Sequence, residues 1–463
     1  MMQAVLQEAV RLLRTHREGK ISLVSHLDAD GIAAASILSK ALDREGIHHT
    51  VTCMKLDQIP DVEPADLILF SDLGSGQLNH LSHLDHCAKI ILDHHPPLEY
   101  SVHNAVHVNP NLSGYDGSSE ISGAGISYLF ARALDRENAD LAPLAIVGAC
   151  GDMQDFGRLS GLNREILEDA HSTGLLEYGD DLLLYGRYTR PLFKSLQYFS
   201  DPFVPGITGN EFGCKQLLET LNIGKKDVQW VTLSDLSFQE KKILASELVK
   251  RSIHHAPPDL GRYIPQMIIG ESYSLTHEEL SSPLKDCNEF ATCLNACGRR
   301  GRFEVGIEVA KGNRGIYYDM LVTLLQEHRA SIACALENMS NTPVRRISGL
   351  QVIDGSGIPD TIVGTCTQML LGQNGIDTYA PLMAYTPSDR DPDVYKISAR
   401  CSRLLLYRNI HMGKAMRNAA REAGGEGGGH APACGAYIPA GHLDEFVQHF
   451  AGLLSLQLGQ PHG

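Results

Sequence analysis

The sequence has no long apolar run. Its longest nearly uncharged stretch, LAPLAIVGACG at residues 141–151, is too short to cross a bilayer, and no signal peptide precedes it. The composition therefore argues against a membrane protein. We expect a cytoplasmic protein with no membrane partner.

Paired cysteines are also absent. The eleven cysteines are scattered singly, and the closest pair, Cys293 and Cys297, has no second pair at zinc-finger spacing. This pattern excludes a zinc finger and predicts reduced thiols, mostly in the core. Trp230 is the only tryptophan, and we expect it to pack within its own module.

Positive charge is in short supply. Forty Lys and Arg residues face 55 Asp and Glu residues, which gives a formal net charge of −15. A broad basic surface for long duplex DNA is therefore unexpected, because Lys and Arg contacts to phosphate supply most non-specific affinity. Carboxylates gathered around divalent cations can still present positive charge to a phosphate, so any nucleic-acid track should be short and local.

The first third of the chain alternates short apolar runs with helical patterns. The runs at 21–26, 48–54, 66–72, 89–95 and 104–110 predict strands, and the segments 31–46, 121–136 and 141–152 predict helices. This alternation is typical of an α/β domain with a mostly parallel sheet covered on both faces. In such sheets ligands bind beyond the carboxyl ends of the strands.

The length of 463 residues predicts more than one domain. The Pro- and Gly-rich stretch at 201–213 marks a boundary. We predict a catalytic domain over 1–200, a helical insertion over 206–275 with Ser237 capping a helix, connecting helices and strands over 276–340, and a smaller mixed α/β domain over 341–463.

Four predicted elements end in acidic or imidazole side chains. The clusters are SHLDADG (25–31), FSDLG (70–74), LDHH (92–95) and GACGDMQD (148–155). Surface polarity alone would not place ligand types at the ends of successive elements. The candidate metal ligands are His26, Asp28, Asp30, Asp72, His94 and Asp152.

Four carboxylates and two imidazoles are enough for two adjacent cations that share one bridging carboxylate. An EF-hand is excluded because Ser39 stands where its twelfth-position Glu should be. The mixed ligand set favours Mn²⁺, with Mg²⁺ or Co²⁺ as substitutes. Two such ions activate a shared water and clamp an in-line displacement at phosphorus, which predicts phosphoester or phosphoanhydride hydrolysis. His95 would contact the scissile phosphate or pass a proton to the leaving oxygen.

These clusters, in this order, resemble the motifs of the DHH phosphoesterases, named for the triplet that here is Asp93, His94 and His95. The resemblance implies that His26, Asp28 and Asp72 hold one ion. The second ion would be held by Asp30, Asp72, His94 and Asp152. Asp72 is then the bridge, and Asp72, Asp93 and His95 are the candidate catalytic residues.

Within that family, SGYDGSSEISGAGISYLF, GDMQDFGRLSGLNREIL, SPLKDCNEFATCLNACGR and KISARCSR resemble the archaeal RecJ-like proteins. This resemblance implies a C-terminal domain that grips substrate. Its expected contacts are Arg400, Arg403, Gly427, Gly428, Gly429 and His430. We expect the glycines to crowd backbone N–H groups around a phosphate, as in other anion nests.

The implied activity is a manganese-dependent exonuclease on single-stranded DNA or RNA that releases mononucleotides, with roles in DNA repair and replication. Two alternatives stay open: a phosphodiesterase of short oligonucleotides or cyclic dinucleotides, which suits the net charge of −15, and a non-catalytic replisome subunit bound to the GINS complex. No metal ligand is missing, which ranks the last alternative lower. Residue order leaves open the polarity of digestion, the preference for DNA or RNA, and the oligomeric state.

Overall fold

The computed structural model describes residues 2–226, 229–373 and 375–459. The chain forms two compact units, Met1–Asp180 with Glu271–Gln326, and Asp181–Gly270 with Glu327–Gly463. The four-domain division expected from the sequence stays a prediction. Among the described residues, no helix combines the length and the apolar character that a bilayer span requires.

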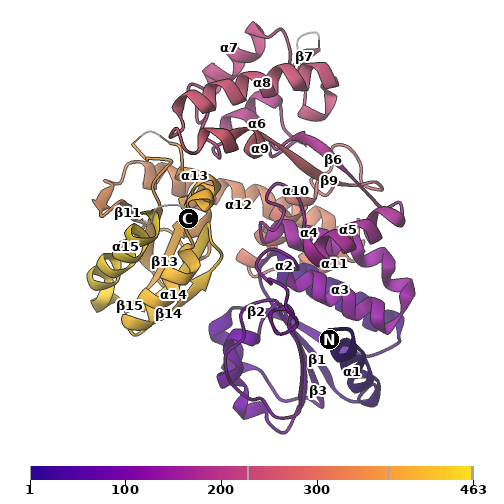
Figure 1. Ribbon diagram of the computed structural model, residues 1–463. Coiled ribbons are helices and arrows are strands. Elements are labelled where there is room, and N and C mark those ends of the chain that lie inside the picture. Colours follow the sequence, from indigo (N-terminus) through magenta and orange to yellow (C-terminus); the bar gives the residue numbers. More distant parts are fainter. Residues whose placement is uncertain (1, 227–228, 374, 460–463) are drawn as a thin grey trace. The chain divides into compact units, whose positions relative to one another are not determined.

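The first unit is built on a five-stranded sheet with strand order β2-β1-β3-β4-β5 (Figure 1). Its strands are β1 (Ile21–His26), β2 (His49–Met54), β3 (Leu67–Ser71), β4 (Ala88–Leu92) and β5 (Ala105–Val108). Every neighbouring pair is parallel, which confirms the predicted sheet. Since β3 is buried along its whole length, its side chains are apolar on both faces.

The two faces of this sheet are covered differently. One face packs on α1 (Met2–Thr15), α2 (Ala29–Arg44) and α3 (Gly123–Leu134), and α4 (Ala142–Gly151) packs on α2 and α3 in the same core. The other face packs on the 3₁₀ helices η1 (Leu56–Asp61) and η2 (Ser75–Leu84), whose core residues include Ile59 and Leu81. Because both faces of the sheet are covered by apolar packing, the polar clusters lie at the carboxyl edge of the sheet.

The rest of the first unit is helical. It comprises α5 (Gly161–Ser172), α10 (Cys287–Arg299), α11 (Phe303–Ala310) and the start of α12 (Ile316–Ser340). The expectation of strands within 276–340 is wrong, because helices take their place in this fully described segment. The chain passes between the units within β6 (Leu176–Leu182), β9 (Ile269–Leu275) and α12.

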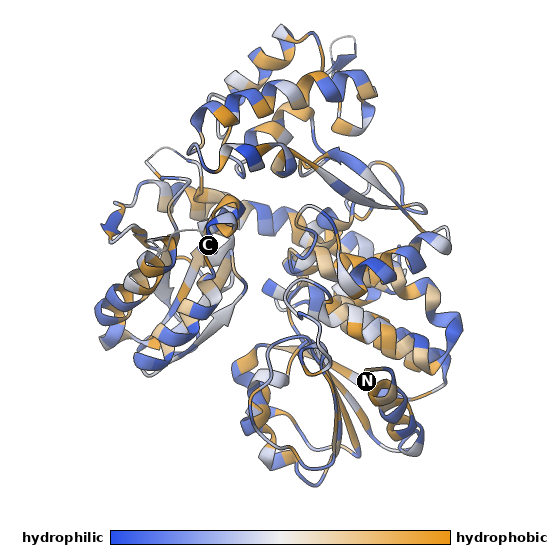
Figure 2. Ribbon diagram, in the orientation of Figure 1, coloured by the Kyte–Doolittle hydropathy of each residue, from blue (hydrophilic) through white to orange (hydrophobic). Residues whose placement is uncertain are grey.

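The second unit begins with a mainly helical segment that includes the predicted insertion of residues 206–275. It contains α6 (Leu192–Tyr198), α7 (Glu211–Thr220), α8 (Phe238–His255), α9 (Ile264–Ile268) and the short strands β7 (Lys225–Lys226) and β8 (Gln229–Trp230). Ser237 caps α8 in a capping box with Glu240, as the sequence predicted. Figure 2 shows hydrophilic and hydrophobic residues mixed along α8, which buries Leu244 and Leu248. Trp230 packs against Phe193 of α6, with ring centroids 5.2 Å apart, so its partner precedes the predicted insertion of residues 206–275.

The C-terminal part of this unit is a mixed six-stranded sheet with strand order β10-β11-β12-β13-β15-β14. The strands are β10 (Arg345–Ile347), β11 (Leu350–Asp354), β12 (Leu382–Pro387), β13 (Val394–Arg400), β14 (Glu426–Gly429) and β15 (Ala433–Pro439). Its helices are α13 (Asp360–Leu370), α14 (Met412–Glu422) and α15 (Leu443–Gly459). The predicted fold class, a mostly parallel α/β domain with an insertion and a mixed C-terminal domain, is confirmed.

The glycine run forms strand β14 at the edge of this sheet, not the anion nest that we expected. It pairs antiparallel with β15, so that Gly428 lies opposite Gly435. A β-carbon at Gly427 would lie 2.8 Å from the Ala436 β-carbon and 2.9 Å from that of Ala420. The glycines therefore let α14 approach the edge strand closely. Consecutive N–H groups of a strand alternate in direction and do not converge on one phosphate.

Candidate metal centre

The polar clusters meet at the carboxyl edge of the parallel sheet. Strand β1 ends at His26, β3 ends one residue before Asp72, and β4 ends one residue before Asp93. The register pairs Ser25 with Ser71 and Ser71 with Leu92, so the three strand ends are level. Asp152 is the C-cap of α4, which packs on α2 and α3.

A first group of ligand atoms comes from His26, Asp28 and Asp72, which lie within 4.8 Å of one another. His26 Nδ1 is 2.8 Å from Asp28 Oδ2 and 3.8 Å from Asp72 Oδ2. Asp28 is also the N-cap of α2, and its Oδ1 accepts a hydrogen bond from the Gly31 N–H. The cap leaves Oδ2 facing His26.

A second group centres on His94. Its Nε2 lies 3.2 Å from Asp72 Oδ1, 3.2 Å from Asp152 Oδ2 and 3.8 Å from Asp30 Oδ2. His94 Nδ1 is 2.6 Å from the carbonyl oxygen of Gly117. A proton on Nδ1 satisfies that carbonyl, which leaves Nε2 as the nitrogen that can bind a metal.

Asp72 is common to two of the groups and is the most constrained residue of the centre. Its φ of 57° is left-handed, a conformation that costs energy for a residue other than glycine and that clusters at functional sites. The side chain is buried, and among the residues that the structure describes neither Oδ1 nor Oδ2 has a hydrogen-bond partner. A buried carboxylate without partners is costly unless a cation compensates it, so the donor set fits a pair of divalent ions that share Asp72.

Asp30 is held from the opposite side by the start of α3. The N–H groups of Gly123 and Ala124 donate to Asp30 Oδ2 and Oδ1 at 2.6 and 3.0 Å. These are the unsatisfied donors of a helix N-terminus, which stabilise a negative charge. The carboxylate of Asp30 is thus fixed in the direction of His94.

The carboxylates repel one another when no cation is bound. Burial, followed by the charges of Asp30, Asp28 and other neighbours, raises the pKa of Asp72 well above its usual range. Burial and the charge of Asp152 raise the pKa of Asp30 to about 6. Burial also raises the pKa of Asp152. A divalent cation would relieve this electrostatic stress, because it stabilises the ionised form of each carboxylate.

The third residue of the triplet is oriented by the first. Asp93 Oδ1 lies 2.9 Å from His95 Nδ1, and Asp93 itself is buried. Burial alone would lower the pKa of His95, but the charge and hydrogen bond of Asp93 raise that pKa to about 9. His95 is therefore held protonated beside the candidate metal ligands.

The predicted substrate contacts all lie in the second unit. Arg400 Nη1 donates to the carbonyl oxygens of Ala399 and Cys434 at 2.9 and 3.2 Å, and Arg403 Nε lies 3.2 Å from Asp201 Oδ2. The N–H of His430 donates to the Ala433 carbonyl beside the strand of Gly427, Gly428 and Gly429. Their role in substrate binding stays a prediction.

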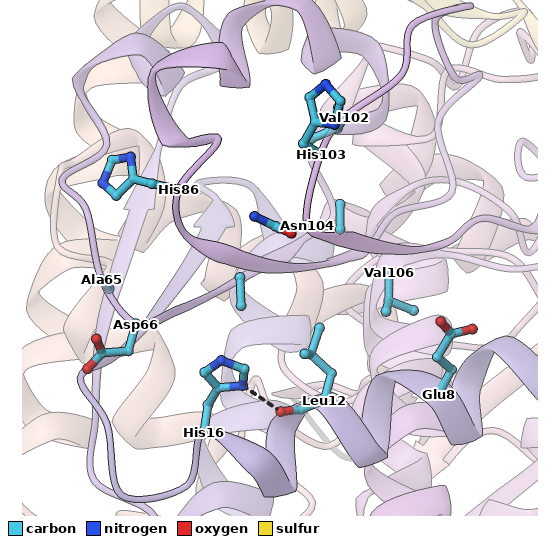
Figure 3. A pocket seen from close by; sticks show the side chains of 12 residues that line it. Glu8, Leu12, His16, Ala65, Asp66, His86, Val102, His103, Asn104 and Val106 are labelled. Atoms are coloured by element: carbon cyan, nitrogen blue, oxygen red, sulfur yellow. Dashed lines mark hydrogen bonds between the residues drawn. The ribbon is translucent and has the colours of Figure 1, made fainter.

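A separate hollow of about 790 Å³ lies beside α1 and the amino ends of β3 and β4. Figure 3 shows His16, His86, His103, Asp66 and Glu8 around it. Among the described residues, these side chains do not gather their ligand atoms as the centre does. The hollow therefore does not compete with the carboxyl edge as the candidate site.

Sequence reasoning missed the residues that support the triplet. Gln154 Nε2 donates to the Gly117 carbonyl at 3.0 Å, and Asn111 Nδ2 donates to the His94 carbonyl at 2.9 Å. Gln154 lies inside the GACGDMQD cluster, two residues beyond Asp152, and that proximity was the available signal. Asn111 lies in the short 3₁₀ helix η3 (Pro110–Ser113), which no sequence pattern marks.

Three family models match the chain. Residues 20–149 match the N-terminal domain of the DHH family, residues 184–261 match the DHH-CID domain, and residues 347–455 match the DHHA1 domain. The chain therefore contains DHH, DHH-CID and DHHA1 domains, and the DHH and DHHA1 matches lie where the sequence resemblance expected the catalytic and C-terminal domains.

A relative of similar length is an uncharacterized protein of Methanocaldococcus jannaschii. It is 28% identical over 460 residues, which cover 95% of this chain and 94% of the relative. The archaeal resemblance therefore extends through nearly the whole chain.

The fold is similar to that of RecJ. RecJ of Thermus thermophilus, solved with Mn²⁺, matches with a TM-score of 0.59 and 18% identity over 99% of this chain, which spans 55% of that protein. A structure described as exonuclease RecJ bound to manganese matches with a TM-score of 0.51 and 17% identity, covering 98% and 95% of the two chains. CDC45 of Entamoeba histolytica matches with a TM-score of 0.62 and 12% identity, covering 98% and 99%. These likenesses establish a shared fold.

Proposed function

We propose that the protein is a two-metal-dependent phosphodiesterase that acts as an exonuclease on single-stranded DNA or RNA and releases mononucleotides. The observation that carries the proposal is Asp72. It is a buried carboxylate without hydrogen-bond partners, in a left-handed conformation, common to the groups of His26 and His94. Such a residue lowers the stability of the metal-free fold, and two bound cations would compensate for this cost by neutralising its charge.

His26, Asp28 and Asp72 would hold one ion, and Asp30, Asp72, His94 and Asp152 would hold the other. The proximity of His26, Asp28 and Asp72, the proximity of Asp30, His94 and Asp152, and the 3.2 Å between Asp72 Oδ1 and His94 Nε2 support this division. When bound, Mn²⁺ or a similar ion supplies positive charge to a phosphate and acidifies water. That two RecJ structures contain manganese supports this choice of metal.

The remaining residues act on the substrate. Burial lowers the pKa of His95, but the Asp93 carboxylate outweighs burial and raises that pKa to about 9. His95 can therefore donate a hydrogen bond to a phosphate oxygen or a proton to the leaving oxygen. Asp93 is the positioning residue that holds the His95 ring. Arg400, Arg403 and the segment from Gly427 to His430 would bind the strand, with the arginines contacting phosphates.

A second candidate is a non-catalytic replisome subunit that binds the GINS complex. The likeness to CDC45, with a TM-score of 0.62, favours it at the level of fold. Loss of metal ligands would mark such a protein, but all six ligand positions carry Asp or His. The catalytic proposal therefore ranks first.

The test is hydrolysis of end-labelled single-stranded DNA and RNA, from long strands down to dinucleotides, with Mn²⁺ and with a chelator. Asp72→Ala is the inactive control. Asp43→Ala, a carboxylate of α2 that pairs with Lys311 away from the centre, is the matched active control. Stepwise, metal-dependent release of mononucleotides that only Asp72→Ala abolishes is the expected result.

Other outcomes have defined meanings. Activity confined to the shortest substrates would replace the exonuclease by a phosphodiesterase of short oligonucleotides or cyclic dinucleotides. If the protein binds Mn²⁺ but cleaves nothing, the replisome subunit becomes the better interpretation, and capture of purified GINS would then be measured directly.

A further inference from the structure

Ser75 is a buried residue whose polar atoms are all engaged around the DHH triplet. Its N–H donates to Asp93 Oδ2 at 2.8 Å, and its carbonyl accepts from the Leu98 N–H at 2.9 Å. Its Oγ lies 2.7 Å from His107 Nε2 and accepts from Asn109 Nδ2 at 2.8 Å. Ser75 is fully buried at the start of η2, just beyond β3.

The same network reaches His95 by two routes. Through Asp93, the Ser75 N–H holds one carboxylate oxygen while the other oxygen accepts from His95 Nδ1 at 2.9 Å. Through Asn109, the amide that donates to Ser75 Oγ also donates to the His95 carbonyl at 2.8 Å. Both the side chain and the backbone of His95 are thus tied to Ser75.

His107 fixes the far end of the network. It lies on the edge strand β5, where it pairs in register with Ile91 of β4, two residues before Asp93. The Ser75 hydroxyl oxygen accepts a hydrogen bond from the Asn109 amide. Its O–H group can therefore donate a hydrogen bond to His107 Nε2. The imidazole therefore sets the rotamer of the serine from a rigid element of the sheet.

We propose that Ser75 and His107 are positioning residues for the reaction: the Ser75 hydroxyl, fixed by His107, holds the Asn109 amide against the His95 carbonyl and thereby aims His95 at the scissile phosphate. The Ser75 N–H that binds Asp93 is a backbone group and stays in place when the side chain is replaced. This inference rests on the proposed phosphodiesterase activity. Neither residue contacts the candidate ions, so both should act on the turnover step through His95 and leave metal binding intact. Carboxylate–histidine pairs depend on such outer contacts, whose loss typically costs roughly 10- to 100-fold in activity.

The test is a double-mutant cycle in the full chain, which compares Ser75→Ala, His95→Ala and the protein that carries both substitutions. We expect Ser75→Ala to lower kcat by roughly 10- to 100-fold, with KM and the Mn²⁺ dissociation constant changed less than about twofold. In the His95→Ala background the same substitution should change kcat by less than about twofold, because its target is gone. His107→Phe should lower kcat as Ser75→Ala does. His107→Gln keeps a hydrogen-bonding group for the Ser75 hydroxyl and should therefore lower kcat less than His107→Phe does.

Ser36→Ala is the matched control, because its hydroxyl is equally buried and donates to Ile32 in α2. A loss of kcat that persists undiminished in the His95→Ala background would overturn the proposal, as would a parallel loss of Mn²⁺ affinity. If the wild-type protein cleaves no substrate, the proposed function fails separately. Carbonyl carbon NMR of the metal-free protein then decides: the His95 carbonyl signal must lose the signature of its hydrogen bond from Asn109 in Ser75→Ala, and an unchanged signal would refute the positioning role.

Discussion

Asp72 and Gly123 lie so close that a β-carbon on residue 123 would stand 2.5 Å from Asp72 Oδ1. The glycine opens the start of α3, and that opening admits the carboxylate while the Gly123 N–H binds Asp30. Two of the candidate ligands are therefore placed by one backbone position.

The Gly123→Ala variant should disturb the metal centre without touching a ligand. The added methyl group must displace Asp72 or α3, so we expect the Mn²⁺ affinity to fall by roughly tenfold or more. Isothermal titration with Mn²⁺ measures the effect. Gly452→Ala, where the new β-carbon meets nothing within 4 Å, should bind as the wild type does.

Metal should stabilise the fold through Asp72. A ligand that binds only the native state adds about 2.7 kcal/mol at 100 times its Kd, so saturating Mn²⁺ should raise Tm and a chelator should reverse the rise. In Asp72→Asn the Mn²⁺-dependent rise should vanish. The metal-free Tm of that variant should match or exceed the wild type, because burial and the neighbouring carboxylates raise the pKa of Asp72 and so penalise its charge. A lower metal-free Tm would contradict this electrostatic account.

The His95–Asp93 pair should make the stability of the metal-free protein depend on pH. Burial opposes the charge of His95, but Asp93 raises its pKa from 6.5 to about 9. A raised histidine pKa contributes stability that is fully present below pH 6.5 and is lost as the pH rises through about 9. Urea unfolding across this window should show a decline in wild type that is smaller in His95→Gln. Equal slopes would mean that the pair does not form in solution.

The helix α8 should depend on its cap. Ser237→Ala removes the side-chain acceptor of the capping box, which should cost about 1 kcal/mol of unfolding free energy and leave metal binding unchanged. Far-UV circular dichroism during urea unfolding measures the loss. Ser246→Ala, an exposed position inside the same helix, should be neutral or slightly stabilising because alanine is the better helix former.

The parallel sheet was predictable because its strands are short apolar runs that stop at polar residues. The six candidate ligands followed from the rule that strand carboxyl ends share one edge, and the structure brings the six side chains together there. The segment FEVGIEVA was not predictable as α11, because a short apolar run suits a strand and a buried helix equally.

Contacts that depend on loops escaped the sequence analysis. Gln154 supports the triplet from a turn, and Asn111 and Ser75 support it from short 3₁₀ helices, where no period marks a buried side chain. The glycine run misled in a different way. Its composition suits a nest, but only the register with β15 reveals that it lies in a strand beneath α14.

The candidate ligands extend from His26 to Asp152, and each ligand group joins residues from distant parts of the chain. The group of Asp30, His94 and Asp152 joins the most distant residues, so ion binding by that group must wait until the chain has closed these long loops. On the ribosome, this second ligand group would therefore stay incomplete until the first 152 residues had emerged. Ion uptake by this group would then report completion of the carboxyl edge of the parallel sheet during synthesis.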